Sequence, residues 1–137
     1  MSISNRQIKL IQKSFAQVEP IADQAAEIFY SYLFKFAPQV RPMFKGDMSS
    51  QGKKLMATLK IAVKSLENLD ALVPVLQNLA KGHVKYGVKA EHYTPVGNAL
   101  LYALRDGLGE DFTPEVRQAW IDAYRLMANV MKDAAYH

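Results

Sequence analysis

Few side chains in this sequence are suited to chemistry, and one histidine stands out among them. The 137 residues contain no cysteine, which excludes disulfides, zinc–thiolate sites, iron–sulfur clusters and a cysteine nucleophile. Three histidines are present. His83 follows Leu79 by four residues on an apolar helical stripe, so its imidazole points where the apolar side chains point. Such a residue is either a hydrogen-bonded core histidine or a neutral axial ligand for haem iron, and this position alone supports both interpretations.

Two further polar residues lie where a binding pocket could use them. Tyr30 stands in the apolar stretch 29–36, and a buried tyrosine needs a partner for its hydroxyl. Gln51 precedes Leu55 by four residues, so the two share one helix face. Structural roles are open for both residues, because Tyr30 can be a core aromatic residue and Gln51 an exposed cap residue.

The elements that position these residues are predicted to be helices throughout, which indicates an all-α single domain over residues 1–137. Ser4 and Gln7 form a capping-box pattern, and Thr94-Pro95 and Thr113-Pro114 read as N-caps followed by proline. We expect six helices from the apolar spacing. They run over residues 4–20, from Pro20 to before Pro38, from Ser49 or Ser50 to about Leu66, from about Leu69 to near Gly87, from Thr94 to Gly109, and from Thr113 onward.

Composition and charge narrow the class of protein. Half of the residues are hydrophobic and 22% are charged, which is typical of a soluble globular chain. Neither a run of 18 apolar residues nor a signal-peptide core is present, so we expect a cytoplasmic protein with no membrane partner. The net charge of +4 does not argue for nucleic-acid binding. Residues 35–89 carry a net charge of +7, which indicates either solvated helix faces or a basic surface for an anionic ligand or acidic partner.

Five blocks, in this order and at these separations, carry a resemblance that covers essentially the whole chain. The sequence resembles the bacterial single-domain haemoglobins and the globin domains of flavohaemoglobins. The blocks are FYSYLFKFAPQVRPMF (29–44), SSQGKKLM (49–56), ENLDALVPVLQNLAKGHVKYGV (67–88), HYTPVG (92–97) and AWIDAYRLMANV (119–130). The resemblance implies a globin fold, a helical sandwich around a b-type haem.

The resemblance also implies a role for each matching residue in the site. His83 matches the proximal haem ligand, which makes it the metal ligand. Tyr30 matches the distal tyrosine that donates to iron-bound dioxygen, and Gln51 matches the distal glutamine. Leu55 matches the apolar residue above the iron, and Phe44 matches the corner phenylalanine that stacks on the porphyrin.

The remaining haem contacts that the resemblance implies follow His83 in the chain. Tyr93 matches the tyrosine packed near the proximal histidine, and Val88 and Val96 fall among the pocket residues. His92 could bond a haem propionate, and the alternative for it is an exposed turn residue. His137 is the last residue, and we expect no role for it.

One position departs from the flavohaemoglobin pattern. Ala135 stands where that pattern has a glutamate bonded to the proximal histidine, and Asp133 is two residues away on another helical face. We therefore expect His83 to donate to a backbone carbonyl near Leu79. Without a carboxylate partner, peroxidase-type chemistry should be weak and the iron potential higher.

The sequence thus predicts a haem-b globin that reversibly binds dioxygen and other diatomic gases such as nitric oxide and carbon monoxide. A further expectation is nitric oxide detoxification, in which nitric oxide and bound dioxygen give nitrate. No flavin or nicotinamide domain is present in these residues, so we expect an external, acidic reductase docked on the basic surface. The alternatives are a gas or nitrite sensor or carrier without turnover, and a haem-free helical interaction domain.

Overall fold

The computed structural model describes residues 3–44 and 46–136, and the elements in these residues are helical. Six α-helices are joined by short 3₁₀ turns. The α-helices are α1 (Asn5–Val18), α2 (Ala22–Phe36), α3 (Met48–Lys64), α4 (Leu69–Lys85), α5 (Tyr93–Leu108) and α6 (Pro114–Ala135). The 3₁₀ turns are η1 (Glu19–Ile21), η2 (Pro38–Met43), η3 (Ser65–Glu67), η4 (Ala90–His92) and η5 (Gly109–Asp111). The all-α prediction is confirmed.

The helix starts follow the local capping chemistry, with two corrections to the sequence prediction. The Ser4 capping box forms, and the Thr113 hydroxyl accepts the Val116 N–H at 3.2 Å. Helix α3 is capped by Asp47 rather than by Ser49 or Ser50, because the Asp47 carboxylate accepts the Ser49 N–H at 3.1 Å. Helix α5 begins at Tyr93 rather than at Thr94, because the η4 turn runs directly into it.

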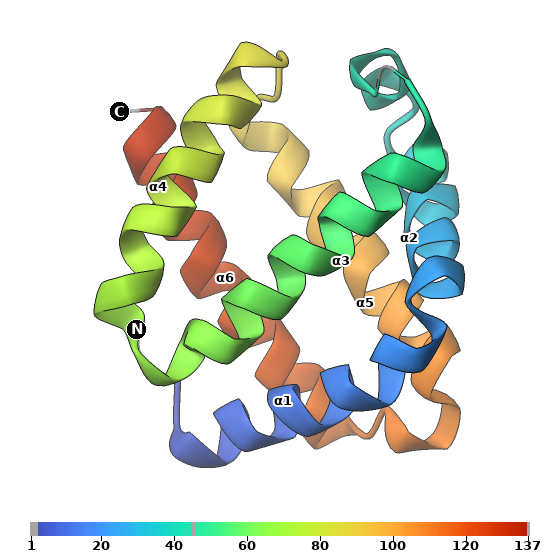
Figure 1. The fold of residues 1–137 in the computed structure, drawn as a ribbon, viewed down its shortest axis with the longest axis vertical. Helices are drawn as coiled ribbons and strands as arrows, with labels where there is room; N and C mark the ends of the chain where they lie inside the picture. Colours follow the sequence, from blue (N-terminus) through green and yellow to red (C-terminus); the bar gives the residue numbers. More distant parts are fainter. Residues whose placement is uncertain (1–2, 45, 137) are drawn as a thin grey trace.

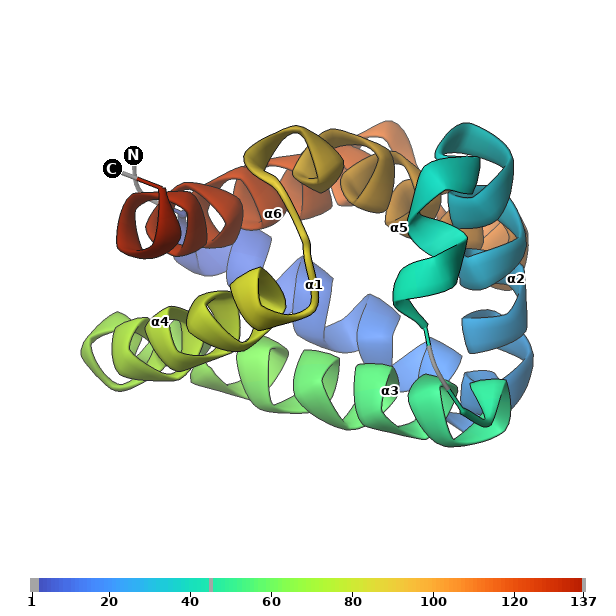
Figure 2. The same ribbon diagram turned by 90° about the horizontal axis from the view of Figure 1, so that it is seen from above.

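The helices form two layers that cross one another. Seen from above, α3 and α4 lie in one layer and α5 and α6 in the other, with α1 between them (Figure 2). Figure 1 shows α3 crossing in front of α5 and α6. In both views α4 and α2 lie on opposite sides of the molecule.

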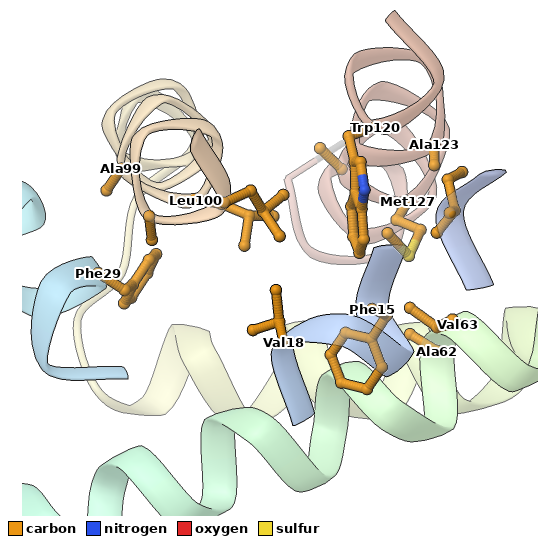
Figure 3. Close-up of a cluster of buried hydrophobic side chains, with 14 of the residues drawn as sticks. Phe15, Val18, Phe29, Ala62, Val63, Ala99, Leu100, Trp120, Ala123 and Met127 are labelled. Carbon is orange, nitrogen blue, oxygen red and sulfur yellow. The ribbon is translucent and has the colours of Figure 1, made fainter. Parts of the chain in front are cut away.

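Helix α1 contributes a central part of the hydrophobic core. Phe15 and Val18 point between α3 and the α5–α6 layer, and Trp120 stands beside them (Figure 3). Trp120 is 1% exposed, and its indole N–H donates to the Ser14 hydroxyl at 2.9 Å. That hydroxyl in turn donates to the Leu10 carbonyl at 2.8 Å, so the buried polar atoms of this pair are satisfied.

The same buried cluster includes side chains from all six α-helices.

None of the described helices combines the length and apolarity that a membrane span requires.

Candidate functional site

Tyr30 of α2 is held in an aromatic cluster that fixes the position of its ring. The side chain is 9% exposed and contacts three phenylalanine rings. Phe29 and Phe44 meet it edge-on, with centroids 5.1 and 5.3 Å away, and Phe34 stacks at 5.8 Å. Offset stacks and edge-to-face contacts are the favoured geometries for aromatic pairs. The ring of Tyr30 therefore has little freedom, and its hydroxyl is presented from a defined point.

The hydroxyl of Tyr30 reaches across to α3. It donates to the backbone carbonyl of Gln51 at 3.3 Å, which is a long bond for an O–H donor. Burial raises the pKa of Tyr30 to about 12, so the hydroxyl keeps its proton at neutral pH. The site therefore holds a protonated, weakly engaged donor on its α2 side.

A glycine allows the two helices to come this close. Gly52 is buried, and a Cβ at this position would lie 3.0 Å from the Cβ of Ala26 on α2. A larger residue would push α3 away from α2 and lengthen the contact between Tyr30 and Gln51. The next turn of α3 carries Leu55, which is half-buried and lines an apolar internal cavity of about 20 Å³ together with Phe29.

His83 lies in the last turn of α4, and α4 and α2, the helix of Tyr30, are on opposite sides of the molecule (Figure 2). Its side chain is half-buried, and burial lowers the pKa of the imidazole, so the ring is neutral at neutral pH. A neutral imidazole has a free nitrogen lone pair, which is the state required of a metal ligand.

The hydrogen bond expected from His83 to a carbonyl near Leu79 is not formed within residues 3–44 and 46–136. In α4 the Leu79 carbonyl faces the backbone N–H of His83, four residues later, and serves the helix ladder. A carbonyl oxygen has a second lone pair, so a bond from the His83 ring to this region stays a prediction. The backbone carbonyl of His83 closes the helix, because it accepts the N–H groups of Tyr86 at 3.1 Å and Val88 at 3.0 Å.

Two tyrosines connect this turn to α5 and α6. The Tyr136 hydroxyl, at the end of α6, donates to the Val88 carbonyl, so it holds the segment that caps the His83 helix. The ring of Tyr136 meets that of Tyr93 edge-on, with centroids 6.5 Å apart. The Tyr93 hydroxyl is the one side-chain polar atom in the described residues that is both fully covered and without a partner.

An unpaired buried hydroxyl is costly, so its presence beside this turn indicates a place built for a further group. Burial, and then the proximity of Tyr136, raise the pKa of Tyr93 to about 12, so the unpaired hydroxyl is protonated. Its backbone is held by Tyr124, whose hydroxyl donates to the Tyr93 carbonyl at 2.6 Å.

His92 differs from one of its two sequence interpretations. It is 5% exposed, so the exposed-turn alternative is wrong. Its Nδ1 accepts the Lys89 N–H at 3.0 Å across the η4 turn, which is why the ring is drawn inward. His92 lines an open pocket of about 660 Å³. Tyr30, Gln51 and His83 do not line this pocket. The propionate contact of His92 stays a prediction, and His137 lies outside the described residues.

The structure thus groups the candidate residues into two walls. On one side Tyr30 contacts the Phe44 ring and the Gln51 carbonyl. On the other side Val88 closes the His83 turn, and Tyr136 links Val88 to Tyr93. Val96 is half-buried and packs against the core.

Two residues of these walls were absent from the sequence prediction. Phe34 could have been found, because it follows Tyr30 by one helical turn. Tyr136 carried no such signal, because its partner is a backbone carbonyl distant in sequence.

Comparison with known proteins agrees with this arrangement. The Globin family model matches residues 27–131. The flavohemoprotein of Bacillus subtilis strain 168 is 29% identical over 132 residues, which cover 93% of this chain and 33% of the relative. The flavohemoprotein of Bordetella bronchiseptica is 34% identical over 106 residues, 75% of this chain and 26% of the relative. The flavohemoprotein of Vibrio cholerae is 27% identical over 134 residues, which cover 96% of this chain and 34% of the relative.

The chain therefore spans about a third or less of the length of these relatives. The family model matches well over half of the chain, and the matched range contains Tyr30, Gln51 and His83. The two walls, apart from Tyr136, thus lie within the part of the sequence that the family shares, and the chain belongs to the globin family.

Proposed function

We propose that the protein, over residues 1–137, is a haem-b globin that binds dioxygen reversibly, with His83 as the iron ligand and Tyr30 as the distal donor. Nitric oxide and carbon monoxide are further ligands of the same site. One observation carries the proposal: in a chain of the globin family, α4 carries a neutral imidazole in its last turn, and α2, on the other side of the molecule (Figure 2), carries a protonated, ring-packed tyrosine.

The residues present fit a haem. Because the chain has no cysteine, haem iron needs a nitrogen ligand, and His83 supplies a neutral imidazole nitrogen. The unpaired Tyr93 hydroxyl belongs to a ring that Tyr136 links to the turn after His83. Several half-buried apolar side chains gain cover if a flat apolar group lies between the walls. These are Phe44, Leu55, Leu79, Val88 and Val96.

When bound, the haem supplies ferrous iron, which takes up diatomic gases and moves negative charge onto dioxygen. Tyr30 then acts as the donor to the ligand. Its single proton is engaged with the Gln51 carbonyl at 3.3 Å, so the hydroxyl must rotate away from α3 to donate to a gas molecule. The three rings around Tyr30 hold its oxygen in place while the proton turns. Gln51 supports this step from α3 as the second distal residue.

The remaining residues of the walls exclude water. Leu55, Phe44 and Val96 offer only apolar atoms to the pocket, so they slow oxidation of the iron and strengthen the bond from Tyr30. The turn that Val88 and Tyr136 close holds the backbone of His83, from which the imidazole projects.

We further propose nitric oxide detoxification, with electrons from a source outside these 137 residues. The name of the relatives, flavohemoprotein, supports a flavin-linked electron supply for proteins of this kind. Charge on this chain supports docking of an acidic reductase, because exposed lysines lie on α3, on α4 and just after α4. They include Lys53, Lys54, Lys81, Lys85 and Lys89, and none of these has an ion pair among the described residues. A cytoplasmic location goes with this role.

The test separates the three remaining interpretations. Purified protein is reconstituted with haem, its visible spectrum is recorded, and nitric oxide consumption is followed by stopped flow with a reductase present. A Soret band with rapid turnover supports the proposal. A Soret band without turnover leaves a sensor or carrier of gas or nitrite. No Soret band after reconstitution means a haem-free helical interaction domain.

A further inference from the structure

We propose that the pocket between η2, η4 and the start of α5 binds a small neutral aromatic molecule that carries a hydrogen-bond acceptor and a donor on one edge. Aromatic carboxamides and nucleobases share this chemistry. The pocket has a volume of about 660 Å³, which is in the usual range for small-molecule sites. The η2 and η4 turns lie at the same end of the molecule (Figures 1 and 2). The inference goes beyond the haem site and does not depend on it.

His92 provides the anchor of this pocket. Because its Nδ1 accepts the Lys89 N–H at 3.0 Å, the neutral ring must carry its proton on Nε2. Nε2 has no hydrogen-bond partner among the described residues, and it is not one of their fully covered polar atoms. The imidazole is 5% exposed and lines the pocket. A buried ring with a fixed tautomer therefore offers one N–H donor to a ligand at this place.

Apolar side chains line the pocket beside the anchor. Met43 and Pro95 are half-buried there, and Phe36 is 40% exposed. The Phe36 ring packs against the rings of Tyr32 and Tyr102, with centroids 5.8 and 5.5 Å away. A large apolar ring that is held in place yet exposed at a pocket mouth is a surface on which a flat ring can stack. This argues for an aromatic ligand over an aliphatic one.

Charge and hydrogen-bonding capacity decide between a neutral and an ionic ligand. The charged residues of the lining are Lys89 and Glu91, so its net charge is zero and an anion gains little. Gln39 and Asn98 add two amides, each of which donates and accepts. A carboxamide or nucleobase edge also donates and accepts, so it can pair with an amide side chain while its acceptor takes the His92 N–H.

This assignment uses the same N–H that a haem propionate would take. The single Nε2–H of His92 can donate either to a haem propionate or to the proposed ligand. Ligand binding measured on the haem-loaded protein therefore distinguishes these two partners. We therefore test the haem-loaded chain with benzamide, its anionic isostere benzoate, the non-aromatic cyclohexanecarboxamide, and adenosine. Titration calorimetry gives the dissociation constants, and the ¹⁵N shift of His92 Nε2 reports direct contact.

We expect saturable binding of benzamide or adenosine with a dissociation constant of about 0.1–1 mM, as for a fragment-sized ligand. Benzoate and cyclohexanecarboxamide should bind at least about tenfold more weakly, and the His92 Nε2 signal should move only with the ligands that bind. Tighter binding of adenosine assigns the nucleobase class, and tighter binding of benzamide assigns the carboxamide class.

Two matched variants keep the result specific. Phe36→Leu removes the stacking surface and should weaken binding about tenfold. Ile61→Ala removes an apolar side chain that is 52% exposed outside the pocket and should leave binding unchanged. No saturable binding of either neutral ligand to the haem-loaded protein, or preference for benzoate, overturns the proposal. If the chain retains no haem, which would contradict only the proposed function, the same titrations on the haem-free chain decide the pocket proposal by the same outcomes.

Discussion

Replacing Tyr30 by phenylalanine removes one oxygen atom and keeps the aromatic cluster. The rings of Phe29, Phe34 and Phe44 surround the Tyr30 ring rather than its hydroxyl, so the phenylalanine can occupy the same place. The carbonyl of Gln51 lies within α3 and keeps its helical partner when the hydroxyl is gone. The substitution therefore tests the donor with little change in packing.

The size of the effect follows from two opposing bonds. A hydrogen bond to the negatively charged end of dioxygen contributes about 1.5–3 kcal/mol, whereas a neutral bond contributes about 0.5–1.5 kcal/mol. The bond from Tyr30 to Gln51 is long, at 3.3 Å, so its loss costs about 0.5 kcal/mol, the lower end of that range. The net stabilisation of bound dioxygen is then about 1–2.5 kcal/mol, or about 5- to 70-fold in affinity.

Flash photolysis and stopped-flow displacement measure the effect as dissociation rates. Tyr30→Phe should raise the dioxygen dissociation rate by about 5- to 70-fold and change the carbon monoxide rate much less, because carbon monoxide carries little charge on its oxygen. Gln51→Leu should act in the same direction with a smaller effect. Tyr102→Phe, which removes a hydroxyl from a ring 39% exposed on α5, is the matched control and should change neither rate.

The pH dependence provides a second check on the same donor. With a pKa of about 12, Tyr30 stays protonated between about pH 7 and pH 10, so the dioxygen dissociation rate should be constant there. Equal effects of Tyr30→Phe on dioxygen and carbon monoxide would show that the residue acts through its shape, and the hydrogen-bond argument would fail.

Three further substitutions test the proximal side. His83→Gly should abolish haem retention at unchanged helicity by circular dichroism, and added imidazole should restore the Soret band; retention without imidazole contradicts the ligand assignment. Ala135→Glu should lower the iron potential and raise peroxidase activity, as measured by spectroelectrochemistry; an unchanged potential with the carboxylate bonded to His83 in a crystal structure contradicts it. Tyr136→Phe removes the bond to Val88 and should speed haem transfer to apomyoglobin about 2- to 13-fold; an unchanged rate contradicts a positioning role.

The sequence predicts the helices well because their signals are local. Apolar spacing, the Ser4 capping box and the Thr113 cap each involve residues within one or two turns, and the structure confirms them. The errors at α3 and α5 have local causes too. Asp47 competes with Ser49 and Ser50 for the same cap, and the η4 turn extends α5 by one residue.

The candidate site is less predictable, because its decisive contacts join distant segments. Tyr30 could be proposed as a donor from its apolar surroundings, but not its engagement with a backbone carbonyl on α3. The burial of His92 depends on a single hydrogen bond across a turn, which no hydrophobic pattern encodes. The Tyr136 contact with Val88 spans 48 residues and leaves no periodic signal.

The two walls are held by different means, and this predicts that their substitutions act on different properties. On the α2 side, ring contacts fix Tyr30 and leave only its proton free to turn, so changes there act on ligand affinity. On the α4 side, His83 depends on a turn closed by the amides of Tyr86 and Val88 and held by Tyr136, so changes there act on haem retention. A substitution at Tyr136 that changed dioxygen affinity as strongly as one at Tyr30, with haem retention unaltered, would contradict this division.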